Sequence, residues 1–135
     1  SYHKFVNKYH FLEEESENAG PIKVQLLKTM SDFMREGHLM MSSQAQYGAK
    51  VSQGIYLVAR LLDTSTDAPP KEAKRFTIGF TVDRFGYLEF DQLKEFKNAQ
   101  ASDRVKALVR GWLKSKNITY DERATDIRFK EISAQ

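Results

Sequence analysis

The stretch RFTIGFTVDRFGYLEF, residues 75–90, decides the fold class of this chain. In its first half, apolar side chains occupy every second position, which is the period of a half-buried β-strand. The segment DRFG, residues 83–86, has turn chemistry, and Gly86 suits the left-handed position of a type I turn followed by a bulge. A second short apolar segment follows this turn. The stretch therefore predicts an antiparallel β-hairpin.

A further strand is expected immediately upstream of the hairpin. Residues 54–63, GIYLVARLLD, are β-prone and apolar on both parities, which is typical of a central strand covered on both sides. Residues 64–74, TSTDAPPKEAK, form a polar connection with paired prolines. We interpret this connection as a long, exposed hairpin loop. Together these segments predict a small, mainly antiparallel sheet built from hairpins.

Two helices are predicted before the sheet. Over residues 2–16 apolar side chains recur at the 3.6-residue spacing of a helix, and residues 18–20 break the pattern. Pro21 suits the first turn of a second helix, which continues as an apolar stripe. Gly37 is expected to end this second helix as its C-cap.

Two helical segments are expected after the hairpin. Asp91 is predicted to cap a short one that carries Leu93 and Phe96. Ser102 is a good N-cap for a longer helix, and Asp103 favours the positive end of its dipole. The buried face of that helix is expected to consist of Val105, Leu108, Val109, Trp112 and Leu113.

The tail of the chain carries Ile127 and Phe129 at strand spacing, which predicts a final strand. The predicted order is therefore α-α-β-β-β-α-β, an α+β domain spanning residues 1–135, with helices covering one side of the sheet. Such an order is compatible with an NTF2-like cone and equally with a ferredoxin-like sandwich. The chain starts without Met inside an amphipathic pattern, so we expect it to be a fragment of a longer protein.

The composition indicates a globular domain, and the missing catalytic motifs favour a binding domain over an enzyme. The chain is 41% hydrophobic and 29% charged, which is ordinary globular usage. It has no cysteine, which excludes disulfides, thiolate zinc sites and cysteine nucleophiles. No catalytic or phosphate-binding motif is present, and no run of apolar residues is long enough to span a membrane.

Two polar patterns near the start of the chain could suggest chemistry. His3, Asn7, His10 and Glu14 recur along one flank of the first predicted helix. A metal could use such a stripe, but an amphipathic helix needs a polar side, and the sequence supplies no obvious third histidine ligand. We therefore assign no metal and no cofactor. We interpret the acidic run EEESE, residues 13–17, as a solvated helix end.

The basic residues predict an anionic partner. The formal net charge is +3 and the sequence pI is about 9.1, which permits contact with nucleic acid or with an acidic protein surface. Three cations recur every four residues on the helix that Ser102 begins, two face outward from the final strand, and one lies on the central strand. The predicted nucleic-acid-binding residues are Lys106, Arg110, Lys114, Arg128, Lys130 and Arg60.

A second function follows from aromatic residues that the core does not need. Phe85 lies inside the predicted turn, where a polar residue is the default, and it either packs over the end of the sheet or stands exposed beside Arg84. Phe11 falls off the apolar face of the first helix. Aromatic and arginine side chains anchor protein interfaces. The alternative function is therefore an assembly or scaffolding domain, in a homo-oligomer or a larger complex, with Phe85, Arg84 and Phe11 at its interface.

Overall fold

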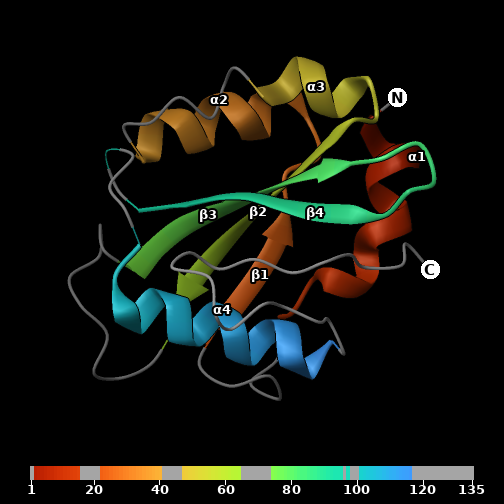
Figure 1. The fold of residues 1–135 in the computed structure, drawn as a ribbon. Coiled ribbons are helices and arrows are strands. Elements are labelled where there is room, and N and C mark those ends of the chain that lie inside the picture. The colour runs from red at the N-terminus through yellow and green to blue at the C-terminus, as the bar shows by residue number, and fades with distance from the viewer. Residues whose placement is uncertain are drawn as a thin grey trace.

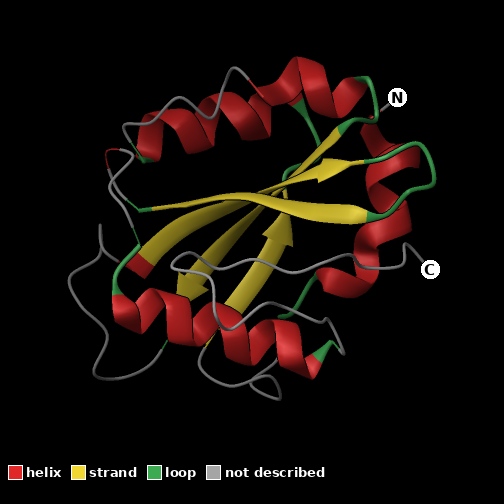
Figure 2. Cartoon of the chain, in the orientation of Figure 1, coloured by secondary structure: helices red, strands yellow, loops and turns green. Residues whose placement is uncertain are grey.

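The computed structural model describes residues 2–15, 22–40, 47–64, 74–95, 97 and 101–116 (Figures 1 and 2). Its elements are α1 (Tyr2–Val6), the 3-10 helix η1 (Asn7–Leu12), β1 (Ile22–Leu26), α2 (Met30–Leu39), α3 (Gly48–Ser52), β2 (Tyr56–Asp63), β3 (Arg75–Val82), β4 (Leu88–Lys94) and α4 (Asp103–Ser115). The four strands form one antiparallel sheet in the order β1-β2-β3-β4. The α+β class is confirmed.

The hairpin that residues 75–90 predict is present as β3 and β4. Its turn is closed by a hydrogen bond from the Gly86 N–H to the Asp83 carbonyl (3.0 Å), and Gly86 has a φ of 87°. This left-handed conformation explains why glycine occupies the position. The expected central strand is confirmed too, because β2 pairs with β1 on one side and with β3 on the other.

Helices cover both faces of the sheet, so the expectation of one covered side is wrong. On β2, Asp63 points toward α4, where it pairs with Arg104. Tyr56 has the opposite parity, and its ring stacks on Tyr47 at the start of α3. Figure 1 shows the same division, with α2 and α3 above the strands and α4 below them. The apolar residues at both odd and even positions of β2 already indicated that both faces of the sheet are covered.

The core joins the N-terminal segment to α4. The Trp112 side chain is fully buried, and its indole N–H donates a hydrogen bond to the Leu12 carbonyl (3.0 Å). Ser102 caps α4 as predicted, because its Oγ accepts a hydrogen bond from the Val105 N–H (3.3 Å). The buried face of α4 matches the prediction, with Leu108 only partly buried: Val105, Val109, Trp112 and Leu113.

The second predicted helix is wrong over its first part. Residues Ile22–Leu26 form β1, whose side chains alternate in burial as a strand requires. The helix starts at Met30, where Thr29 and Asp32 form a capping box, and it continues past Gly37 to Leu39. The apolar residues of this region fit a helical stripe as well as a strand, and pairing with β2 decides for the strand.

The short helix predicted at Asp91 is also wrong. Asp91 lies within β4, where its carboxylate accepts a hydrogen bond from the Tyr56 hydroxyl (2.5 Å). The first predicted helix ends at Leu12, and Glu14 then forms a β-bridge with Val24. The predicted final strand, with Ile127 and Phe129, lies outside the described residues. Within the described ranges, none of the helices has the length and apolarity needed to cross a membrane.

Candidate functional site

The turn between β3 and β4 is a fixed platform for an exposed aromatic ring. The Phe85 side chain is 71% exposed, and the Arg84 guanidinium lies 4.8 Å from the centre of its ring. Asp83 Oδ1 accepts hydrogen bonds from the N–H groups of Phe85 (2.8 Å) and Tyr87 (3.0 Å). The Tyr9 hydroxyl donates to the Gly86 carbonyl (2.8 Å). The backbone around Phe85 is thus held by the turn itself and by the N-terminal segment.

Two more exposed apolar side chains lie near this turn. Tyr87 is 38% exposed, and Ile55 is 47% exposed. The Val82 N–H donates to the Ile55 carbonyl (3.0 Å), which brings Ile55 to the base of the hairpin. We call Ile55, Arg84, Phe85 and Tyr87 the hairpin tip. Phe11 is not comparable to Phe85, since it is partly buried and packs against the core.

The four predicted basic residues that the structure describes are not brought together on one surface. Lys106, Arg110 and Lys114 lie on α4, below the sheet, and Lys114 is the most exposed of the three. Arg60 has the same parity on β2 as Tyr56. Its side chain therefore lies on the face of the sheet opposite α4, toward α2. Arg128 and Lys130 lie outside the described residues. Arg60 therefore belongs to a different site from the α4 cations.

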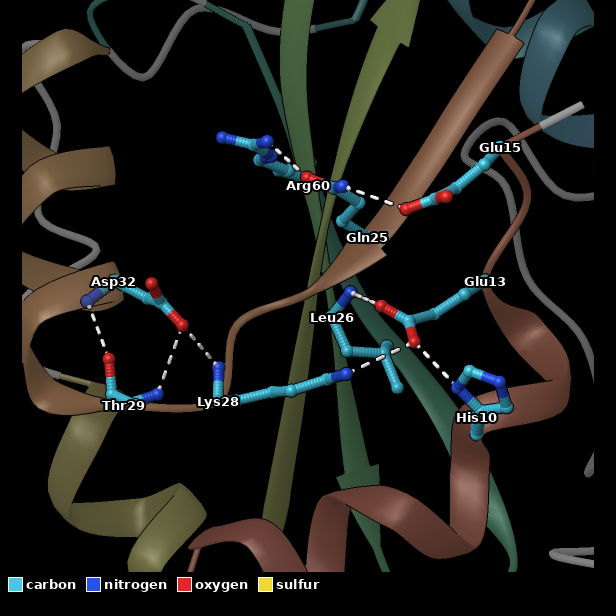
Figure 3. Close-up of polar contacts among 9 residues, drawn as sticks. All are labelled: His10, Glu13, Glu15, Gln25, Leu26, Lys28, Thr29, Asp32 and Arg60. Carbon is cyan, nitrogen blue, oxygen red and sulfur yellow. Dashed lines mark hydrogen bonds and ion pairs between the residues drawn. The ribbon is translucent and has the colours of Figure 1, made fainter.

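Arg60 lines a pocket between β1, α2 and the segment that follows η1. The pocket has a volume of about 530 Å³, and its walls carry charged side chains of both signs. Figure 3 shows how Gln25 connects two of them, with Arg60 donating to Gln25 Oε1 and Gln25 Nε2 donating to Glu15 (3.2 Å). Sequence reasoning missed this pocket because its walls come from segments far apart in the chain.

Glu13 anchors one wall of the pocket and is not part of a solvated helix end. Its Oε2 accepts a hydrogen bond from the Leu26 N–H (3.1 Å), and its Oε1 lies 3.2 Å from Lys28 Nζ and 2.7 Å from His10 Nδ1 (Figure 3). Burial acts to raise the pKa of Glu13, but these hydrogen bonds and the Lys28 charge together hold that pKa below its ordinary value. The ionised carboxylate thus ties the N-terminal segment to β1.

The lowered pKa of Glu13 predicts an acid-dependent stability. The contribution of Glu13 is present above its unfolded pKa, about 4.3, and is lost as pH falls through the lower folded pKa. We expect Glu13→Gln to lower the free energy of unfolding at pH 7, and to lower it less below pH ~4. Urea unfolding of both proteins across this pH range measures the difference. If the difference in free energy of unfolding between wild type and Glu13→Gln stayed constant with pH, the proposed role of the Glu13 charge would be contradicted.

Glu36 is a buried carboxylate on the α2 wall of the same pocket. The residue is 1% exposed, and its Oε1 accepts a hydrogen bond from Arg75 Nη1 (2.7 Å). Burial raises the pKa of Glu36, and the positive charges of Arg75, Arg60 and Arg35 oppose this shift without cancelling it. Its Oε2 has no hydrogen-bond partner among the described residues. A signal was present in the sequence, because Glu36 shares the buried face of α2 with Phe33.

The described residues contain no group of three or more His, Cys, Asp or Glu side chains that could hold a metal ion. The fold is an α+β domain whose antiparallel sheet has helices on both faces. No protein-family model, curated protein or solved structure matches the chain. Its function is therefore argued from its own surfaces.

Proposed function

We propose that this chain is an assembly domain that associates with a second copy of itself through the hairpin tip. The observation that carries the proposal is the 71% exposure of Phe85 on a backbone held by hydrogen bonds. A preordered aromatic anchor loses little conformational entropy when it is buried in an interface. A solvent-exposed ring of this kind has no role in the core of its own domain.

The chemistry of the tip supports a partner that carries the same surface. A two-fold interface requires a patch that is complementary to itself. The tip carries aromatic rings at Phe85 and Tyr87 and a cation at Arg84, and the carboxylate of Asp83 lies next to it in the turn. Two such tips related by a two-fold axis can pair ring with ring, and the cation of one with the rings or carboxylate of the other.

The test of this proposal is the oligomeric state. We expect light scattering on a sizing column to detect a dimer or larger species that grows with protein concentration and persists at high salt, since apolar contacts are weakly screened. Phe85→Ser should give a monomer with an unchanged circular dichroism spectrum. Met34→Ser is the matched control, because Met34 is 62% exposed on α2, away from the tip. A wild-type monomer at all concentrations, or an oligomer that survives Phe85→Ser, would contradict the proposal.

Nucleic-acid binding through α4 is the second candidate. Arg110 and Lys114 have no carboxylate partner among the described residues, and with Lys106 they recur every four residues along the helix. This stripe favours contact with a phosphate backbone. The predicted cations Arg128 and Lys130 remain candidates for the same surface, whereas Arg60 does not.

The same sizing-column experiment distinguishes nucleic-acid binding from self-association. A mixed-sequence oligonucleotide that shifts the protein only at low salt supports the α4 surface, because phosphate contacts release counterions. Joint charge reversal at Lys106, Arg110 and Lys114 should abolish that shift and leave the oligomeric state unchanged. A shift that survives the charge reversal, or that is equal at high salt, would contradict the α4 assignment.

A further inference from the structure

The pocket beside α2 is lined by four carboxylates, of Glu13, Glu15, Asp32 and Glu36, and by three permanent cations, of Lys28, Arg35 and Arg60. Three guanidinium groups act on the single carboxylate of Glu36, namely those of Arg75, Arg60 and Arg35. Arg75 alone forms an ion pair with it. Arg60 and Arg35 therefore act on Glu36 without forming an ion pair with it, whereas Arg75 does.

Arg60 is held in place by a neutral partner. Its guanidinium donates to Gln25 Oε1, and the amide of Gln25 is in turn oriented by Glu15 (Figure 3). Arg60 forms no ion pair within the described part of the chain. A guanidinium that is positioned by an amide keeps its charge and its remaining N–H donors for another group.

Arg35 adds a second guanidinium from α2. It is exposed, it lines the pocket, and its charge acts on Glu36. Among the described residues it contacts no carboxylate. Because Arg35 and Arg60 line the same pocket, the Arg35 side chain can approach a group bound near Arg60.

The other three carboxylates of the pocket, Glu13, Glu15 and Asp32, accept hydrogen bonds within the protein, and that of Glu15 comes from Gln25 Nε2 (3.2 Å). Glu13 is held by Leu26, Lys28 and His10, as described above. Asp32 Oδ2 accepts hydrogen bonds from the N–H groups of Lys28 (2.9 Å) and Thr29 (3.1 Å), which is its role in the capping box. These contacts leave Arg60 and Arg35 as the cations of the pocket that are open to an external anion.

We propose that this pocket binds a small molecule bearing an oxyanion, a carboxylate or a phosphate group, through the guanidinium groups of Arg60 and Arg35. Arginine binds such groups through paired N–H donors whose geometry matches two oxygens. A volume of about 530 Å³ is within the range of sites for small ligands. The site lies on a different part of the fold from the hairpin tip, so it does not depend on assembly.

Two substitutions, one at Arg60 and one at Glu36, test the proposal because they should change the anion affinity in opposite directions. An oxyanion at Arg60 and Arg35 is repelled by the Glu36 carboxylate, which also competes for the same cations. Arg60→Gln should weaken binding about tenfold or more, because it removes a charge-assisted contact. Glu36→Gln should tighten binding several-fold, an effect that a purely structural role of either residue would not produce. Lys8→Gln on η1 is the matched control, because Lys8 is exposed, does not line the pocket, and loses the same unit of positive charge.

The experiment is a titration of the whole chain with sodium phosphate and, separately, sodium acetate at constant ionic strength, followed by NMR. The side-chain amide signal of Gln25 is the local reporter, since Gln25 contacts Arg60 directly. Saturable shifts with phosphate alone identify a phosphate site, and saturable shifts with acetate identify a carboxylate site. Shifts that do not saturate with either anion, or equal affinities for wild type and Arg60→Gln, would overturn the proposal.

Discussion

Replacing Trp112 with alanine is expected to lower the free energy of unfolding by about 4 kcal/mol. The side chain is fully buried and is the largest in the core. Its removal leaves a cavity where α4, η1 and the sheet meet, and it breaks the hydrogen bond from the indole N–H to the Leu12 carbonyl. A loss of this size is a large share of the stability of a typical domain.

The measurement is urea unfolding followed by far-ultraviolet circular dichroism, because Trp112 is the single tryptophan and its fluorescence disappears with it. Trp112→Phe separates the contribution of core packing from that of the hydrogen bond to the Leu12 carbonyl. It keeps most of the apolar volume but leaves the buried Leu12 carbonyl without its donor, which we expect to cost about 1–3 kcal/mol. If Trp112→Ala cost no more than Trp112→Phe, the packing argument would be wrong.

Gly79→Ala is expected to destabilise the sheet by about 2 kcal/mol through a steric clash. A Cβ at Gly79 would lie 2.8 Å from Tyr56 Cζ, and closer still to the Tyr56 hydroxyl oxygen. The Tyr56 ring cannot easily move aside, because it stacks on Tyr47 at a centroid distance of 4.8 Å and its hydroxyl donates to Asp91. Burial, together with the Asp91 carboxylate, raises the pKa of Tyr56, so the hydroxyl stays protonated as a donor.

A double-mutant cycle tests whether Tyr56 is the cause. In a Tyr56→Ala background the clash is absent, and alanine in place of glycine loses less backbone entropy on folding. Gly79→Ala should then be neutral or slightly stabilising, which gives a coupling energy of about 2 kcal/mol between the two positions. An equal loss in both backgrounds would show that the cost comes from the backbone of β3 rather than from Tyr56.

The proposed assembly at the hairpin tip and the proposed anion binding in the pocket depend on different residues. The tip depends on Tyr9, whose hydroxyl holds the Gly86 carbonyl, and on the Asp83 side chain, which holds the turn. The pocket depends on Gln25, which orients Arg60. Phe85→Ser and Arg60→Gln therefore alter separate sites, and each should leave the other property intact.

The sequence alone determined the elements whose signals are local. The hairpin of residues 75–90, the two-sided burial of β2 and the Ser102 cap of α4 all follow from alternation, parity and capping within one short segment. The exposure of Phe85 was one of two outcomes that the turn sequence allowed. Packing decided it, because Tyr9 holds the turn without covering the ring.

Only the tertiary structure decided what depends on contacts between distant segments. Residues Ile22–Leu26 became a strand because β2 offered an edge to pair with, although their pattern also fits a helix. Arg60 is separated from the cations of α4 because strand parity places its side chain on the α2 face of the sheet. Glu13 and Glu36 became parts of a pocket because burial is set by the neighbours that folding supplies, and these neighbours lie up to 39 residues away along the chain.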